Sequence, residues 1–248
     1  MIITPLIAPI LLWGAVILLG GLGGAGVAAA AGAFKDPKKN KLGILGMQGA
    51  GKTRFLSFLK NIPFRDGTTS RSEYEDIKYQ LSNGKKIIIK SGIDIGGGNT
   101  YRVDYNKIID ESDVLLYFFD IDKYLKNVRD NDDEHYQRSC NSRFEHIYSK
   151  VKMNKEEYEK LKRDHREEED NNLKKRIKEK IEQLKPKPII VIATHKDKYG
   201  SSENEMGKKF DKLVQNKIYK EMLKDVQYVN LTNPSETQRL VNTIFNNK

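Results

Sequence analysis

The residues best suited to chemistry form one short run, GMQGAGKT, at positions 46–53, which we name the phosphate loop. It fits G-x-x-x-x-G-K-[ST], a pattern whose glycines let the backbone turn its N–H groups toward phosphate oxygens. Lys52 is expected to reach the outer phosphates, and Thr53 to place its hydroxyl on Mg²⁺, which prefers oxygen ligands. The remaining residues expected to contact the nucleotide here are Gly46, Gln48, Gly49, Ala50 and Gly51.

The flanking residues supply the elements that this loop needs. The apolar run at 42–45 is typical of a short buried strand. After the loop, Phe55, Phe58 and Leu59 recur at the spacing of one helix face. The order strand, loop, helix favours a phosphate site over a glycine-rich turn with an exposed lysine.

Further candidates follow the helix. Thr69 is the predicted switch threonine, which would give Mg²⁺ a second hydroxyl and sense the γ-phosphate; Thr68 is the near alternative, and a plain polar loop is the other interpretation. Segments 74–81 and 86–90 predict a hairpin around Ser82–Gly84. At the end of the next strand, Asp94 is expected to hold Mg²⁺ through a water. Gly97 is expected to offer its N–H to the γ-phosphate.

Continuous apolar runs at 113–120 and 189–193 are typical of parallel strands buried on both faces. Strand and helix signals alternate along the chain from residue 42 onward. The alternation predicts an α/β fold with a doubly wound, mostly parallel sheet in three layers.

These motifs together resemble the Ras-like small GTPases, within the P-loop NTPases, and most closely the Arf branch and the β subunit of the signal recognition particle receptor. That branch carries D-[VI]-G-G-Q with an arginine four residues later, and Asp94–Gly97 followed by Arg102 is similar. Gly98 stands where the family has the glutamine that orients the attacking water. The resemblance implies binding of GTP or GDP with Mg²⁺, with Lys52, Thr69 and Gly97 at the catalytic centre, and slow hydrolysis.

The same resemblance assigns base recognition to residues 194–197, which we name the base segment. The family has N/T-K-x-D after a strand, and this chain has Thr194, His195, Lys196 and Asp197. The aspartate of that motif accepts hydrogen bonds from N1–H and the 2-amino group of guanine. His195 stands where the family has lysine under the base. Thr232, after a last strand predicted at 227–231, occupies the position of the family's second base-contacting loop.

The amino-terminal residues predict a membrane anchor. No charged side chain occurs between Pro5 and Phe34, and a spanning helix needs about 20 apolar residues. We expect a transmembrane helix at Leu6–Ala28, with the lysines that follow it placing the rest of the protein in the cytoplasm. A cleavable signal peptide is one alternative, and a dinucleotide fingerprint at Gly21–Gly26 is a weaker one.

Composition limits the other possibilities. The chain of 248 residues has a formal charge of +10, which favours contact with either nucleic acid or an anionic membrane. Its single cysteine, Cys140, excludes an internal disulfide.

Residues 126–187 predict a helical insertion in which 155–170 carry charges of both signs without interleaved aromatic residues. Nucleic acid is therefore not expected as a partner, and the insertion is either surface decoration or an arm that binds a protein.

The apolar positions of the insertion predict two helix faces that dock on the domain. The first face comprises Phe144, Ile147, Tyr148 and Val151, and the second comprises Leu173, Ile177, Ile181 and Leu184. This insertion is the part of the chain that the family resemblance does not cover.

The predicted organisation is an anchor at 1–34, a basic linker at 35–41 and a GTPase domain at 42–248. The expected function is a membrane-anchored GTP/GDP switch that hydrolyses GTP slowly and meets a protein partner through its switch loops or its insertion. The alternative is a GTP-liganded receptor or scaffold that recruits a soluble partner without cycling. A P-loop ATPase or kinase is a third interpretation, which the base segment disfavours.

Overall fold

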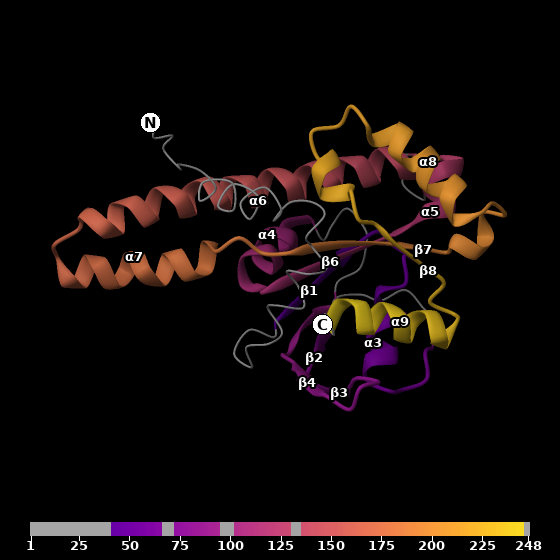
Figure 1. The fold of residues 1–248 in the computed structure, drawn as a ribbon, viewed down its shortest axis with the longest axis horizontal. Helices are drawn as coiled ribbons and strands as arrows, with labels where there is room; N and C mark the ends of the chain where they lie inside the picture. The colour runs from indigo at the N-terminus through magenta and orange to yellow at the C-terminus, as the bar shows by residue number, and fades with distance from the viewer. Residues whose placement is uncertain (1–40, 66–71, 95–101, 130–134, 246–248) are drawn as a thin grey trace, which may run out of the picture.

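The computed structural model describes residues 41–65, 72–94, 102–129 and 135–245, and it has an α/β architecture (Figure 1). Its centre is a four-stranded sheet with the order β1-β6-β7-β8, in which every pairing is parallel. The strands are β1 (Leu42–Gly46), β6 (Val114–Asp120), β7 (Ile189–Thr194) and β8 (Gln227–Val229). The predicted α/β class with a parallel sheet is confirmed.

Every residue of β1, β6 and β7 is buried, which explains why these segments are almost purely apolar. Helices cover both faces of the sheet in Figure 1: α3 and α9 lie on one face, and α4, α6 and α8 on the other. Their bounds are α3 (Lys52–Leu59), α4 (Arg102–Glu111), α8 (Glu203–Val214) and α9 (Pro234–Phe245). Short 3₁₀ turns cover η2 (Lys196–Lys198) and η3 (Lys220–Leu223).

Two antiparallel pairs extend the fold beside β1. Strand β3 (Ile77–Gln80) pairs with β4 (Lys86–Ile89), so the predicted hairpin is confirmed, and Gly84 turns it at a φ of 82°. Strand β2 (Ser72–Tyr74) is separate from β3 and pairs with β5 (Gly92–Asp94). A parallel bridge between Lys41 and Lys90 leads from this region to β1, which brings Asp94 toward the phosphate loop.

Helix α5 (Ile121–Lys126) ends where the predicted insertion, 126–187, begins. The insertion contains α6 (Tyr136–Glu167) and α7 (Asn171–Leu184). The first half of α6 buries Phe144, Ile147 and Val151 against the sheet, as predicted. From residue 155 to residue 183 no side chain is buried, and Figure 1 shows α6 and α7 projecting together from the domain. We name residues 155–184 the helical arm.

One prediction about the insertion is wrong. The face of α7 was expected to dock on the domain, but only Leu184 is buried and Leu173 is 45% exposed. Helix α7 instead packs along α6, where Lys180 and Glu157 form an ion pair of 2.5 Å. The apolar spacing correctly predicted a helix with one apolar face. That face packs on the second half of α6, which is itself exposed to solvent, and not on the sheet.

The predicted membrane span, Leu6–Ala28, and the linker up to residue 40 lie outside the described residues. Within the described ranges, none of the helices has the length and apolar character needed to cross a bilayer.

Candidate functional site

Three segments that are far apart in the sequence meet at the carboxyl edge of the parallel sheet. The phosphate loop follows β1, Asp120 ends β6, and the base segment begins at the end of β7. Ligands of open α/β sheets bind outside the carboxyl ends of the strands, so this edge is where a site is expected.

The backbone of the phosphate loop requires glycine at its first position. Gly46 has a φ of 140°, and a Cβ there would lie 2.1 Å from the carbonyl oxygen of Phe118. The next residue donates its backbone N–H to that same carbonyl, at 2.9 Å. Gly51 precedes α3 with a φ of 87°, so it starts the helix from a left-handed conformation. The loop thus ends at a helix N-terminus, whose free N–H groups favour an anion.

Lys52 is buried behind the loop, with 6% of its surface exposed. Its Nζ donates to the carbonyl oxygens of Gly46 at 3.2 Å and Met47 at 2.8 Å. Burial lowers the pKa of Lys52 to about 8, partly opposed by the charge of Asp94 and reinforced by that of Arg143. A phosphate in the loop would favour the charged form of this lysine, so the site gains from binding an anion.

Thr53 and Asp94 form the other half of this arrangement. The Thr53 hydroxyl donates to Oδ2 of Asp94 at 2.9 Å, and Asp94 is 3% exposed. Its Oδ1 is also buried and has no hydrogen-bond partner within the described residues. Burial raises the pKa of Asp94, with the Thr53 hydrogen bond and Lys52 acting against it. A hydroxyl beside a carboxylate with an unsatisfied buried oxygen fits the oxygen ligands that Mg²⁺ requires.

The base segment is joined to the phosphate loop by Thr194. Its side chain is 1% exposed, and its Oγ1 lies 3.1 Å from the carbonyl oxygen of Ala50 and 3.0 Å from that of Phe119. One hydroxyl proton serves these two acceptors. The threonine therefore fixes the end of β7 against both the loop and β6.

His195 is held in a left-handed conformation, with a φ of 59°. Its Nδ1 lies 3.2 Å from Oδ2 of Asp120 and 3.0 Å from Oγ1 of Thr194. Burial lowers the pKa of His195, although the charge of Asp120 acts in the opposite direction, so the ring is neutral at pH 7. A proton on Nδ1 shared with Asp120 leaves Nε2 as an acceptor.

The last two residues of the base segment have different surroundings. The Lys196 ammonium pairs with Glu203 at 3.1 Å and Glu236 at 3.0 Å, so it links η2 to α8 and α9. Asp197 is exposed within η2, and its carboxylate has no hydrogen bond to any other described residue. Its position after β7 leaves that carboxylate accessible to a ligand.

Thr232 is exposed, and its N–H and hydroxyl donate to Oδ1 of Asn230, at 2.9 and 2.6 Å. The neighbouring Leu231 was not among the sequence candidates, yet a Cβ on Gly51 would lie 2.6 Å from its Cδ1. Asp120 was missed as well. The available signal was a carboxylate ending a buried strand, which is the same signal that identified Asp94.

The switch and catalytic predictions at Thr68, Thr69, Gly97 and Gly98 lie outside the described residues. The structure therefore brings together the phosphate loop, Asp94 and the base segment. It leaves the assignment of the switch loops as a prediction.

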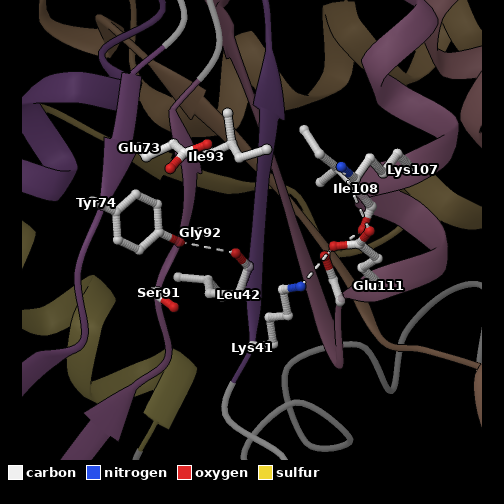
Figure 2. Close-up of a pocket in the computed structure, with 11 residues that line it drawn as sticks. Lys41, Leu42, Glu73, Tyr74, Ser91, Gly92, Ile93, Lys107, Ile108 and Glu111 are labelled. Carbon is white, nitrogen blue, oxygen red and sulfur yellow. Dashed lines mark hydrogen bonds and ion pairs between the residues drawn. The ribbon is translucent and has the colours of Figure 1, made fainter.

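A pocket of about 210 Å³ occurs at the amino end of β1, away from the phosphate loop (Figure 2). Lys41 pairs with Glu111 at 2.7 Å on one side, and the Tyr74 hydroxyl donates to the carbonyl oxygen of Leu42 at 3.1 Å on the other. Because the predicted site residues lie at the opposite strand end, this pocket is separate from the candidate site.

The chain matches no protein-family model, and comparison with curated proteins gives no match. The ground for a functional proposal is therefore the arrangement of side chains at the carboxyl edge of the sheet.

Proposed function

We propose that this protein binds guanine nucleotide with Mg²⁺ at the carboxyl edge of its sheet. The observation that carries the proposal is the contact of 3.1 Å between the Thr194 hydroxyl and the Ala50 carbonyl. A nucleotide extends from its phosphates to its base, so its two binding segments must lie side by side. Here a loop suited to phosphate lies against a segment suited to guanine.

Each residue has a role that follows from its chemistry. Lys52 and the N–H groups of the loop neutralise and orient the phosphates, while Thr53 and Asp94 hold Mg²⁺, the latter through a water. The bound Mg²⁺ would supply charge stabilisation at the phosphates. Asp197 accepts two hydrogen bonds from guanine, a pair of donors that adenine does not present. The observed order of β1, phosphate loop and α3 supports a P-loop fold of the Ras-like kind.

As a switch, the protein would hydrolyse GTP slowly, because glycine replaces the water-orienting glutamine at position 98. Residues 6–28 would anchor it in the membrane with the nucleotide site in the cytoplasm, where GTP and Mg²⁺ are available. The helical arm favours a second candidate, a GTP-liganded scaffold, because its exposed apolar side chains could bind a protein. Leu173 is exposed on the arm, and Met153, two residues before the arm begins, is 63% exposed. Turnover separates the two functions.

The test uses the full-length protein in a mild detergent. A fluorescent GTP analogue is bound at equilibrium and then displaced by GTP, GDP or ATP, and GTP turnover is followed in the same preparation. We expect GTP and GDP to compete at concentrations at least about tenfold lower than ATP, because adenine lacks the donors for Asp197. Equal competition by ATP would contradict guanine recognition, and absence of binding would contradict the whole proposal.

Replacing Asp94 with asparagine is expected to weaken the dependence of GTP affinity on Mg²⁺. The variant keeps the shape of the side chain and the Thr53 hydroxyl beside it but removes a charge that holds the ion through a water, so Mg²⁺ should improve GTP binding less in Asp94→Asn than in the wild type. The loss should be about tenfold at millimolar Mg²⁺. Titrations with Mg²⁺ and with EDTA give the comparison.

The matched control is Asp211→Asn, which removes a carboxylate exposed on α8. Thermal unfolding without nucleotide checks that Asp94→Asn is folded; burial disfavours the Asp94 carboxylate, so the variant should be no less stable. An unchanged Mg²⁺ response in Asp94→Asn would exclude this residue from the ion site.

A further inference from the structure

Arg143 lies on the buried face of α6, within the insertion, and none of the sequence motifs includes it. Only 2% of its surface is exposed. One guanidinium N–H donates to the Tyr105 hydroxyl, at 3.4 Å. Burying a guanidinium is costly, and an apolar side chain of similar volume would fill the same space at lower cost. The position therefore calls for a function beyond packing.

Tyr105 continues the contact into the phosphate loop. It belongs to α4, is 1% exposed, and its hydroxyl donates to the carbonyl oxygen of Gly46 at 3.3 Å. The same carbonyl accepts the Lys52 ammonium at 3.2 Å. Arg143, Tyr105, Gly46 and Lys52 thus form one continuous series, which we name the arginine relay. Donors and acceptors are consistent at each of its three steps.

The relay also brings two buried cations, Lys52 and Arg143, near the phosphate loop. The first donates to the Gly46 carbonyl, and the second reaches the same carbonyl through the Tyr105 hydroxyl. A phosphate anion in the loop would offset both positive charges, so the pair favours an occupied site.

We propose that Arg143 is a positioning residue for the phosphate loop: it orients the Tyr105 hydroxyl, which holds the Gly46 carbonyl and through it the Lys52 ammonium. The proposal deepens the proposed function and rests on it for the identity of the ligand, a nucleotide phosphate. Since Arg143 belongs to the same helix as the first half of the helical arm, the insertion takes part in phosphate binding.

The test compares Arg143→Met, Tyr105→Phe and the double variant in the full-length protein. Each single change should weaken GTP binding at pH 7 by about fivefold to tenfold. Tyr105→Phe removes the buried hydrogen bond to the loop, and Arg143→Met removes the hydrogen bond that orients Tyr105. The double variant should lose about as much as one single variant, since both act through one contact.

A second measurement does not need nucleotide. Amide hydrogen exchange can follow the Met47 N–H, which comes directly after the Gly46 carbonyl and donates to the Phe118 carbonyl at 2.9 Å. Arg143→Met and Tyr105→Phe should both speed its exchange relative to the N–H groups of β7, because the Gly46 carbonyl loses the Tyr105 hydroxyl or the group that orients it. A residue with a purely structural role would speed exchange in the loop and in β7 alike.

The control is Ile147→Val, which alters a buried apolar residue on the same helix and should change neither measurement beyond a general loss of stability. Unchanged hydrogen exchange at Met47 in folded Arg143→Met would overturn the proposal. If that variant does not fold, unchanged GTP affinity in Tyr105→Phe overturns it instead. If the wild type fails to bind nucleotide, the proposed function is wrong, and hydrogen exchange at Met47 still tests the relay.

Discussion

Replacing Lys52 with methionine is expected to abolish nucleotide binding while making the nucleotide-free protein more stable. The ammonium is the cation aimed at the phosphates, so affinity should fall by at least about a hundredfold. The same ammonium is buried, and its pKa is lowered from 10.5 to about 8, so keeping it charged destabilises the fold. After allowing for its two lost hydrogen bonds, we expect the variant to gain about 1–2 kcal/mol in free energy of unfolding at pH 7.

Urea denaturation at two pH values tests this result. Between pH 8 and 10.5 unfolded chains retain the Lys52 proton while folded chains lose it, so wild-type stability from this group rises with pH. The advantage of Lys52→Met should therefore be present at pH 7 and smaller at pH 9.5. Lys208→Met, at an exposed lysine of α8, is the control and should show neither effect. A variant less stable than wild type at pH 7 would contradict the argument.

Replacing Asp197 with asparagine is expected to change the preferred base from guanine to xanthine. The carboxylate accepts from N1–H and the 2-amino group of guanine, and an amide cannot accept both. The amide offers a donor instead, which suits a base with a carbonyl at position 2, as in xanthine. We expect GTP affinity to fall about a hundredfold and xanthosine triphosphate to become the better ligand.

Competition of the two triphosphates for a fluorescent analogue measures the exchange. Because Asp197 is exposed and has no hydrogen bond to another described residue, stability without nucleotide should be unchanged. Asp225→Asn, at another exposed carboxylate, should bind GTP normally. Retention of GTP preference in Asp197→Asn would show that this carboxylate does not contact the base.

The sheet and the local order around the loop were predictable from the sequence because their signals are local. A fully apolar run such as 114–119 is typical of a strand buried on both faces, and β6 is such a strand. The spacing after the loop predicted α3, and its buried residues include Phe55 and Leu59. Phosphate, base and metal candidates could be named for the same reason, since each is tied to the end of a strand.

The arginine relay and the course of α7 were not predictable because both depend on contacts across the chain. Arg143 lies four residues before Ile147, on the apolar face predicted for this helix, but its contact with Tyr105, 38 residues away, leaves no signal in the sequence. The apolar positions of α7 are compatible with docking on a sheet or on another helix, and periodicity alone cannot tell these apart.

Helix α6 is longer than is needed to connect β6 with β7. Strand β6 has seven residues, about 23 Å, and the helix between Tyr136 and Asn154 already covers about 28 Å. The helical arm therefore lies beyond the part of α6 that returns the chain from the carboxyl end of β6 to the amino end of β7. It has no buried residue before Leu184, so it contributes no other side chain to the core. We therefore expect amide hydrogen exchange to be faster in the helical arm than in the sheet, although the arm begins in the same helix that holds Arg143.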